Sequence, residues 1–180
     1  MNVNDILNKA LKLLGIDDVT VIVGSSDARL TRLVNALGVA YMQLITEYAP
    51  LEKEEAVTVT GGECALSALS ATLFDVVRLR DLSDKTVKCH IRGGKLLTEN
   101  DGAYRLTYYY LPSSYPAAGG TIVLPERITA DLFARGVAAE YALESLLYEE
   151  AVTHERKYKE GLLNVLSCHK RLHVEAKRWI

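Results

Sequence analysis

Three groups of residues have types and spacings that could do chemistry, and the first is Val21-Ile-Val-Gly-Ser-Ser-Asp27. This stretch is typical of a strand turning into a helix, whose free N–H groups and dipole favour an anion. It lacks the second and third glycines of a dinucleotide-binding turn and the Gly-Lys-Ser/Thr of a P-loop. Asp27 also places a carboxylate where the anion would bind. The stretch therefore predicts a capped helix start, and we expect no cofactor.

The second group contains histidines. His169 and His173 are four residues apart, a spacing that can bring two imidazoles to one metal, and Cys168 is adjacent. A zinc site needs a third and a fourth ligand, and no spaced Cys/His cluster supplies them. His154 and His90 are distant in sequence and have no motif around them. We therefore expect no metal site, and interpret the two histidines as a solvated or interface pair.

The third group contains possible nucleophiles and acids. No Gly-x-Ser-x-Gly and no cysteine with a family signature is present. Ser67, Ser70 and Ser83 lie in strand-like or turn segments. The carboxylate pairs Glu54-Glu55 and Glu149-Glu150 lie in charge-rich runs, which are usually solvated faces. The sequence therefore predicts no catalytic residue, and we expect a protein that is not an enzyme.

Composition limits the remaining classes of function. A chain of 180 residues with 49% hydrophobic content is long enough for one domain, or for one with a sizeable insertion. Its formal net charge of -2 provides no global basic field for nucleic acid. Three widely spaced cysteines favour a reducing compartment. We find no apolar run as long as a membrane span and no signal peptide, so we expect a soluble protein made in a cytosol.

The elements that would carry any site begin with two long helices between Leu124 and Ile180. Leu124-Pro125 is expected to open the first helix, and Thr153 to cap the second. Apolar residues recur at three- and four-residue steps in both. Those of the first are Ile128, Leu132, Phe133, Val137, Tyr141, Leu143, Leu146 and Leu147; those of the second are Tyr158, Leu162, Val165, Leu166 and Leu172.

Small residues in the first of these helices indicate close packing on more than one side. They are Gly136, Ala138, Ala139 and Ala142, which let a neighbouring backbone approach. We interpret these four positions as packing sites between subunits of an oligomer. The alternative is an ordinary helical core within one chain.

Two helices are also expected near the N-terminus. Asn4 is a candidate cap for Asp5 to Leu14, and Asp27 with the preceding serines for a helix that ends before Pro50. A short strand is expected between them at Val19 to Val23.

The middle of the chain alternates with the period of strands and is punctuated by glycine turns. Its expected strands are 56–60, 64–69, 74–79, 86–91, 95–97, 104–111 and 121–124, with turns at Gly61-Gly62, Gly93-Gly94 and Asn100-Asp101-Gly102. Segregated helices and strands indicate an α+β fold. We predict a helical bundle from residues 1–55 and 125–180, with an antiparallel β insertion, a sheet or sandwich, at residues 56–124.

The C-terminus has a local basic bias, in which only Glu175 opposes Lys170, Arg171, Lys177 and Arg178, and Trp179-Ile180 follows. Exposed apolar ends tend to mark contacts. Two interpretations stay open, namely docking on a partner chain and folding back on the chain's own bundle.

The order of several segments resembles the head–tail adaptor (connector, neck or gatekeeper) proteins of tailed bacteriophages. The segments are Tyr108-Tyr-Tyr-Leu-Pro112, Ile122-Val-Leu-Pro125, Gly136-Val-Ala-Ala-Glu-Tyr-Ala142, Tyr148-Glu-Glu-Ala151, and Tyr158 with Leu162. The likeness spans most of the chain as an order of elements. One departure is Ala117-Ala-Gly-Gly120, where the family's pattern would have a more polar, acidic turn.

The resemblance implies a structural virion protein that forms a ring, usually of twelve copies, below the portal. Such a ring extends the DNA channel, presents a surface for the tail or the next neck protein, and lets double-stranded DNA pass without specific binding. Weak phosphate contact suits a conduit, because every neutralised phosphate adds salt-dependent affinity. Under this hypothesis Lys170, Arg171, Lys177, Arg178, Trp179 and Ile180 dock on the portal.

Three alternatives remain. A stopper or tail-completion protein of a phage neck would also be small and ring-forming, but richer in strands. A small cytosolic enzyme or regulator with a helical dimer core would bind or turn over a ligand such as a nucleotide. A bacterial scaffold of no phage origin would have a plain bundle.

Overall fold

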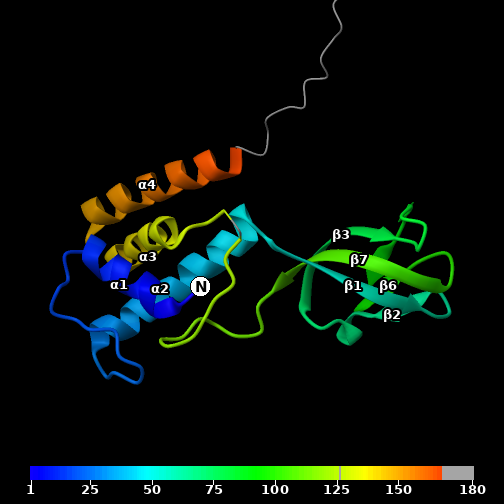
Figure 1. Ribbon diagram of the computed structural model, residues 1–180, viewed down its shortest axis with the longest axis horizontal. Helices are drawn as coiled ribbons and strands as arrows, with labels where there is room; N and C mark the ends of the chain where they lie inside the picture. Colours follow the sequence, from blue (N-terminus) through cyan, green and yellow to red (C-terminus); the bar gives the residue numbers. More distant parts are fainter. Residues whose placement is uncertain (126, 168–180) are drawn as a thin grey trace, which may run out of the picture. The chain divides into compact units, whose positions relative to one another are not determined.

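The chain has an α+β fold made of two compact units (Figure 1). The structure is a computed structural model, and it describes residues 1–125 and 127–167. Of these residues 42% are helical and 25% are in strands, so helix dominates as the sequence predicts. The helical unit is Met1–Leu44 with Pro116–Ile180, and the β unit is Ile45–Tyr115.

Within the described residues, the helical unit contains four α-helices. They are α1 (Val3–Leu13), α2 (Ala28–Gln43), α3 (Ala130–Glu144) and α4 (Tyr148–Ser167), and α2 continues as a π-helical turn at Leu44–Tyr48. α3 packs against α1, α2 and α4 (Figure 1). The edge of the Tyr41 ring meets the buried ring of Phe133 at 6.2 Å between centroids, and the Tyr41 hydroxyl donates to the Val123 carbonyl at 2.8 Å. The interior is therefore continuous between helices from the two ends of the chain.

Helix starts in the structure are set by side-chain oxygens, and three of the predicted starts are wrong. Asn2, not Asn4, caps α1, and its Oδ1 accepts from the backbone N–H of Asn4 at 2.8 Å. α3 begins at Ala130 and not at Leu124-Pro125; Thr129 is its cap, and the Oγ1 atom of Thr129 accepts from the N–H of Leu132 at 3.2 Å. Thr153 lies inside α4, where its hydroxyl donates to the Glu149 carbonyl.

Two expected strands of the helical unit do not form. Val19 to Val23 is irregular, and Ile22 and Val23 are 60% and 65% exposed. β propensity alone does not make a strand, because its value depends on the neighbours that pair and pack. The expected strand at 121–124 is reduced to one bridge between Asn2 and Thr121, flanked by hydrogen bonds from Val3 to Gly120 and from Ile122 to Met1.

The β unit contains two antiparallel sheets. One has the order β1-β7-β3-β4, from Leu51–Val59, Gly102–Leu111, Thr72–Arg80 and Thr86–Val87. The other has the order β2-β6-β5, from Glu63–Ala65, Lys95–Leu97 and His90–Arg92. Gly93 and Gly94 both have positive φ in the tight turn between β5 and β6, as the pair predicts.

The β unit differs from its prediction at three places. β1 begins at Leu51 and not at residue 56, since the charged run Glu52 to Glu55, expected in the helical bundle, is part of an edge strand. The expected strand 86–91 is divided between the two sheets as β4 and β5, and that at 64–69 ends early in a 3₁₀ turn at Leu66–Ala68. Asp101 does not turn a hairpin; its carboxylate accepts from the N–H groups of Gly61 and Gly62 at 2.9 and 2.7 Å.

The β unit has its own apolar core, formed by alternate residues of several strands. Its buried members are Val57, Val59, Leu79, Leu96, Tyr104, Leu106 and Tyr108. Among the helices that the structure describes, none has both the length and the apolarity needed to cross a lipid bilayer.

Candidate interaction surface

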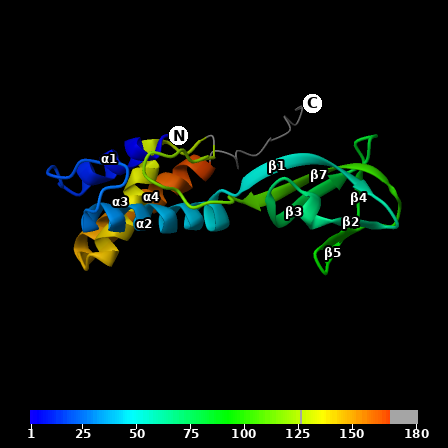
Figure 2. The same cartoon turned by 90° about the horizontal axis from the view of Figure 1, so that it is seen from below.

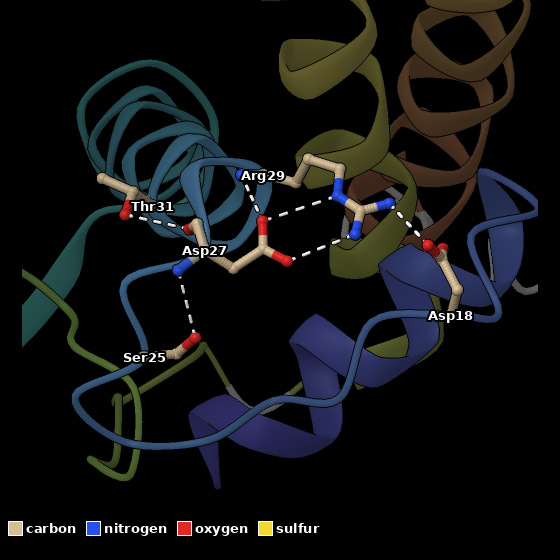
Figure 3. Close-up of polar contacts among 5 residues, drawn as sticks. All are labelled: Asp18, Ser25, Asp27, Arg29 and Thr31. Atoms are coloured by element: carbon tan, nitrogen blue, oxygen red, sulfur yellow. Dashed lines mark hydrogen bonds and ion pairs between the residues drawn. The ribbon is translucent and has the colours of Figure 1, made fainter.

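The start of α2, the candidate anion site, is occupied by the chain's own carboxylate (Figure 3). Asp27 Oδ1 accepts from the backbone N–H of Arg29 at 2.8 Å, which satisfies the helix start. The Arg29 guanidinium forms ion pairs with Asp27 at 3.2 Å and Asp18 at 2.8 Å, and hydrogen bonds from it hold the pKa of both carboxyls below the usual value. The predicted helix cap at Asp27 is confirmed, and a phosphate at this point would be repelled by two ionised carboxylates.

A shallow groove of about 170 Å³ lies beside this helix start, between the α1–α2 loop, α2 and Ala118. Its apolar walls come from Ile22, Leu30 and Val34. Pockets for drug-sized ligands measure roughly 300–1,000 Å³, so this groove is too small for a nucleotide.

A serine in the β unit lies between a lysine and a carboxylate. The Ser70 hydroxyl donates to Glu55 and contacts Lys53, and the Ser70 N–H donates to the second oxygen of Glu55 at 3.1 Å. A Ser–Lys pair would need a neutral lysine as base. Hydrogen bonding to Glu55 raises the pKa of Lys53, so this lysine stays protonated. The cluster therefore ties the loop at Ser70 to β1 and does not activate a nucleophile.

No group of three or more potential metal ligands occurs within residues 1–125 and 127–167. His154 is half-buried, and its buried Nδ1 has no hydrogen-bond partner in this part of the chain. Burial, with the nearby charges of Lys157 and Arg135, lowers the pKa of His154 and keeps the imidazole neutral. Cys168, His169 and His173 lie outside the described residues.

The main apolar feature of the helical unit's surface is the turn from α3 to α4. Its five exposed apolar side chains, which we call the knuckle, are Leu143 (50% exposed), Leu146 (69%), Leu147 (44%), Tyr148 (59%) and Val152 (63%). Exposed apolar clusters of this kind mark contact sites on otherwise polar surfaces. Glu144, Glu149 and Glu150, all exposed, lie between these residues in the sequence and give the knuckle an acidic margin.

The knuckle is held by a defined turn. Leu147 N–H donates to the Ala142 carbonyl at 2.8 Å and Leu146 N–H to the Leu143 carbonyl at 3.1 Å, the paired bonds of a Schellman ending. The position that usually carries glycine holds Leu146, at φ 63°. A left-handed conformation costs a residue with a β-carbon about 1–2 kcal/mol, and strain of this kind persists where the surroundings fix it. The most exposed leucine of the knuckle is therefore presented on a strained backbone.

The sequence placed these residues incorrectly. Leu143, Leu146 and Leu147 were predicted in the buried stripe of the first C-terminal helix, but α3 ends at Glu144 and all three are exposed. A signal for the knuckle was present, because Leu146, Leu147 and Tyr148 are consecutive, and consecutive residues cannot share one helix face.

The four small residues expected between subunits lie inside the chain's own bundle. Gly136, Ala138, Ala139 and Ala142 are buried. A β-carbon at Gly136 would stand 2.8 Å from the Tyr158 ring. The close approach is therefore between α3 and α4 of one chain, and oligomer packing can no longer rest on these positions. The expected portal-docking residues Lys170, Arg171, Lys177, Arg178, Trp179 and Ile180 lie outside the described residues.

The chain matches no protein-family model and no curated protein.

Proposed function

We propose that this chain is a non-enzymatic head–tail adaptor of a tailed phage. In this role it assembles as a ring below a portal, extends the DNA channel and carries the surface on which a tail or a further neck protein docks. Its site of action is the virion neck, after synthesis in the bacterial cytoplasm. The order of elements supports the proposal, since helices from both ends of the chain form a bundle and an antiparallel β unit is inserted between them.

The observation that carries the proposal is the knuckle. A protein that acts by assembly needs an apolar contact surface on a rigid element, and five exposed apolar side chains are gathered on one hydrogen-bonded turn. Neighbouring subunits or the portal would cover them. The segment from Lys170 to Ile180 remains a proposed second contact with the portal.

The test replaces one valine of the knuckle by a charged residue. Val152→Glu is expected to lower the yield of portal-bound rings about tenfold or more, because burying an unpaired carboxylate in a contact is costly. Val39→Glu is the matched control, since Val39 is a 50% exposed valine on α2 outside the knuckle. Negative-stain electron microscopy of each variant mixed with portal rings counts the assembled particles.

Equal assembly of Val152→Glu and the control would overturn the role of the knuckle. A parallel deletion of residues 168–180 tests the C-terminal contact, and full portal binding by the truncated chain would refute it. A stable dimer that does not bind the portal would instead favour a regulator or enzyme with a helical dimer core. Rings that bind only below another neck protein would favour the alternative that the chain is a stopper or tail-completion protein.

A further inference from the structure

The β unit exposes a row of cations that its own acids do not neutralise. Lys85, Lys88 and Arg92 are exposed and have no ion-pair partner within the described residues, and His90 is exposed between the last two. We call Lys85, Lys88, His90 and Arg92 the basic row. Three of these four residues are cations for which the described part of the chain supplies no ion-pair partner.

The nearby acids are already engaged. Asp84 forms ion pairs with Arg80 at 3.0 Å and Arg105 at 3.1 Å, and Glu63 pairs with Lys95. The carboxylate of Asp81 accepts from the backbone N–H groups of Ser83 and Lys85. Within the described residues, Asp84 and Glu63 are therefore already paired with other cations, and the positive potential of the basic row can act on a ligand from outside.

The apolar residues between the cations fix the direction of the row. Val87 and Cys89 pack against the core of the β unit, and Leu96 on the paired strand β6 is fully buried. His90 and Arg92 share one face of β5 at a spacing of about 6.8 Å, since side chains alternate along a strand. Ile91 is paired with the buried Leu96, so His90 and Arg92 lie on the face of β5 that is turned away from the core.

The surroundings of the row admit a bulky polymer. β5 is the edge strand of its sheet, and Figure 2 shows its hairpin projecting at the margin of the β unit. A β-carbon added at Gly93 or Gly94 would meet no atom within 4 Å, so the tip of the hairpin is open.

The chemistry of the row distinguishes its partners. Protein contacts have an apolar centre and a polar rim, whereas the centre of this row is cationic. Residues 85–95 contain no Phe, Tyr or Trp, and His90 alone offers a ring, whereas single-strand binders stack successive bases on several aromatic side chains. Resting on the adaptor function proposed above, we propose that the basic row contacts the phosphates of double-stranded DNA passing through the assembled ring.

The contact is weak because only three cations make it, and a weak contact suits a channel through which DNA must move. Three cations that neutralise three phosphates give a slope of about −2.7 for log K against log salt. Binding of this size is measurable at low ionic strength and nearly lost at physiological salt. DNA would be guided by the row and still be free to move.

The experiment uses the full chain and a short blunt DNA duplex, followed by amide chemical shifts at low salt. We expect shifts confined to residues 85–95 and a slope of about −2.7 between roughly 20 and 200 mM salt. The triple variant Lys85→Gln/Lys88→Gln/Arg92→Gln should bind about tenfold more weakly and lose most of the slope. Lys12→Gln/Arg156→Gln/Lys157→Gln is the matched control, because it removes the same charge from exposed cations of α1 and α4.

Each remaining outcome contradicts the inference. Absence of binding by the wild type at low salt, or equal binding by the two triple variants, would overturn it. Unchanged DNA binding with impaired ring assembly in the basic-row variant would assign the row to an acidic protein partner instead. Portal assembly measured on the same samples keeps the two proposals apart, because rings that form normally without DNA contact refute only the basic row.

Discussion

The helical unit and the β unit arrange their surfaces in opposite ways. In the helical unit five exposed apolar side chains gather at one turn, while several charges are paired, as in Lys9–Asp131 and Lys159–Glu155. In the β unit the unpaired cations gather beside one edge strand, while exposed apolar residues such as Phe74 and Leu82 are separate. Under the two proposals above, the difference corresponds to two kinds of partner for one chain, an apolar protein surface and a polyanion.

The two interiors also differ in how they reach close packing. In α3 and in α4, a side chain of the other helix packs closely against a glycine, and we call these two positions the glycine notches. The ring of Tyr158 packs against Gly136 of α3, and the side chain of Leu132 packs against Gly161 of α4. The β unit instead fills its core with large and branched side chains from alternate strand positions. The helical hairpin should therefore be sensitive to added volume, whereas the β unit has no such notch at its centre.

The largest effect is expected from Gly136→Val. The new β-carbon would stand 2.8 Å from the buried Tyr158 ring, which cannot move aside as a flexible chain end could. Overpacking of this kind costs about 2–3 kcal/mol, more than the gain in helix propensity. Urea denaturation followed by circular dichroism at 222 nm measures the loss.

Gly161→Ala is the control for this prediction. Its β-carbon would meet only the terminal methyl of Leu132, which can rotate away, and alanine gains up to about 1 kcal/mol over glycine within a helix. We expect almost no net change in the free energy of unfolding. Equal losses for the two variants would show that the notches are not specific to the ring of Tyr158.

A smaller effect of opposite sign is expected from Leu146→Gly. Glycine adopts φ 63° without strain, so the variant should be about 0.5–1 kcal/mol more stable, after the entropy that glycine adds to the unfolded state. The same change removes the most exposed leucine of the knuckle, so ring assembly should fall. Thermal melting and electron microscopy of the same sample measure the two quantities.

Leu147→Gly separates strain from side-chain loss. Leu147 is 44% exposed in the same knuckle, but its φ is not positive. This variant should lose assembly and also lose stability. A gain of stability in both variants would contradict the role of strain at Leu146.

The sequence predicted which residues are buried within a helix better than it predicted where a helix ends. Periodicity correctly placed buried residues such as Phe133, Val137 and Leu162, because a stripe at helical spacing must face a core. It failed at the α3–α4 turn, since Leu146 and Leu147 have the same residue type as core positions and only the hydrogen bonds of the turn expose them. An apolar residue at helical spacing is therefore predicted to be buried only if the helix extends to its position.

The candidate surfaces were predictable to different degrees. The cap at Asp27 follows from residue type alone, whereas the partners of Arg29 include Asp18, eleven residues away, and needed the folded loop. The basic row was visible as residues in the sequence. The charge of the basic row stays unpaired because Asp84 pairs with Arg105 and Glu63 pairs with Lys95. These ion pairs depend on the tertiary fold, and no local sequence pattern predicts them.

The smallest expected effect is a difference in how stability depends on pH at two carboxyl groups, Glu140 of the helical unit and Asp101 of the β unit. In the helical unit, burial and the neighbouring charges of Glu144 and Glu155 raise the pKa of Glu140 above 4.5. The ionised form is therefore penalised at neutral pH, and the penalty disappears as pH falls through the raised pKa toward 4.5. Glu140→Gln should stabilise the chain by on the order of 0.5 kcal/mol near neutral pH, after solvent screening, and by nothing in acid.

Asp101 of the β unit should respond in the opposite sense. Hydrogen bonds from the N–H groups of Gly62 and Gly61 hold its pKa below 3.8, so its stabilisation is present above that pH and is lost as pH falls through the lowered pKa. Asp101→Asn should therefore lower the melting temperature by a small amount near neutral pH and by less in strong acid. Melting temperatures of both variants across this pH range test the contrast, and parallel pH profiles for the two variants would contradict it, because the two carboxyls are shifted by opposite causes.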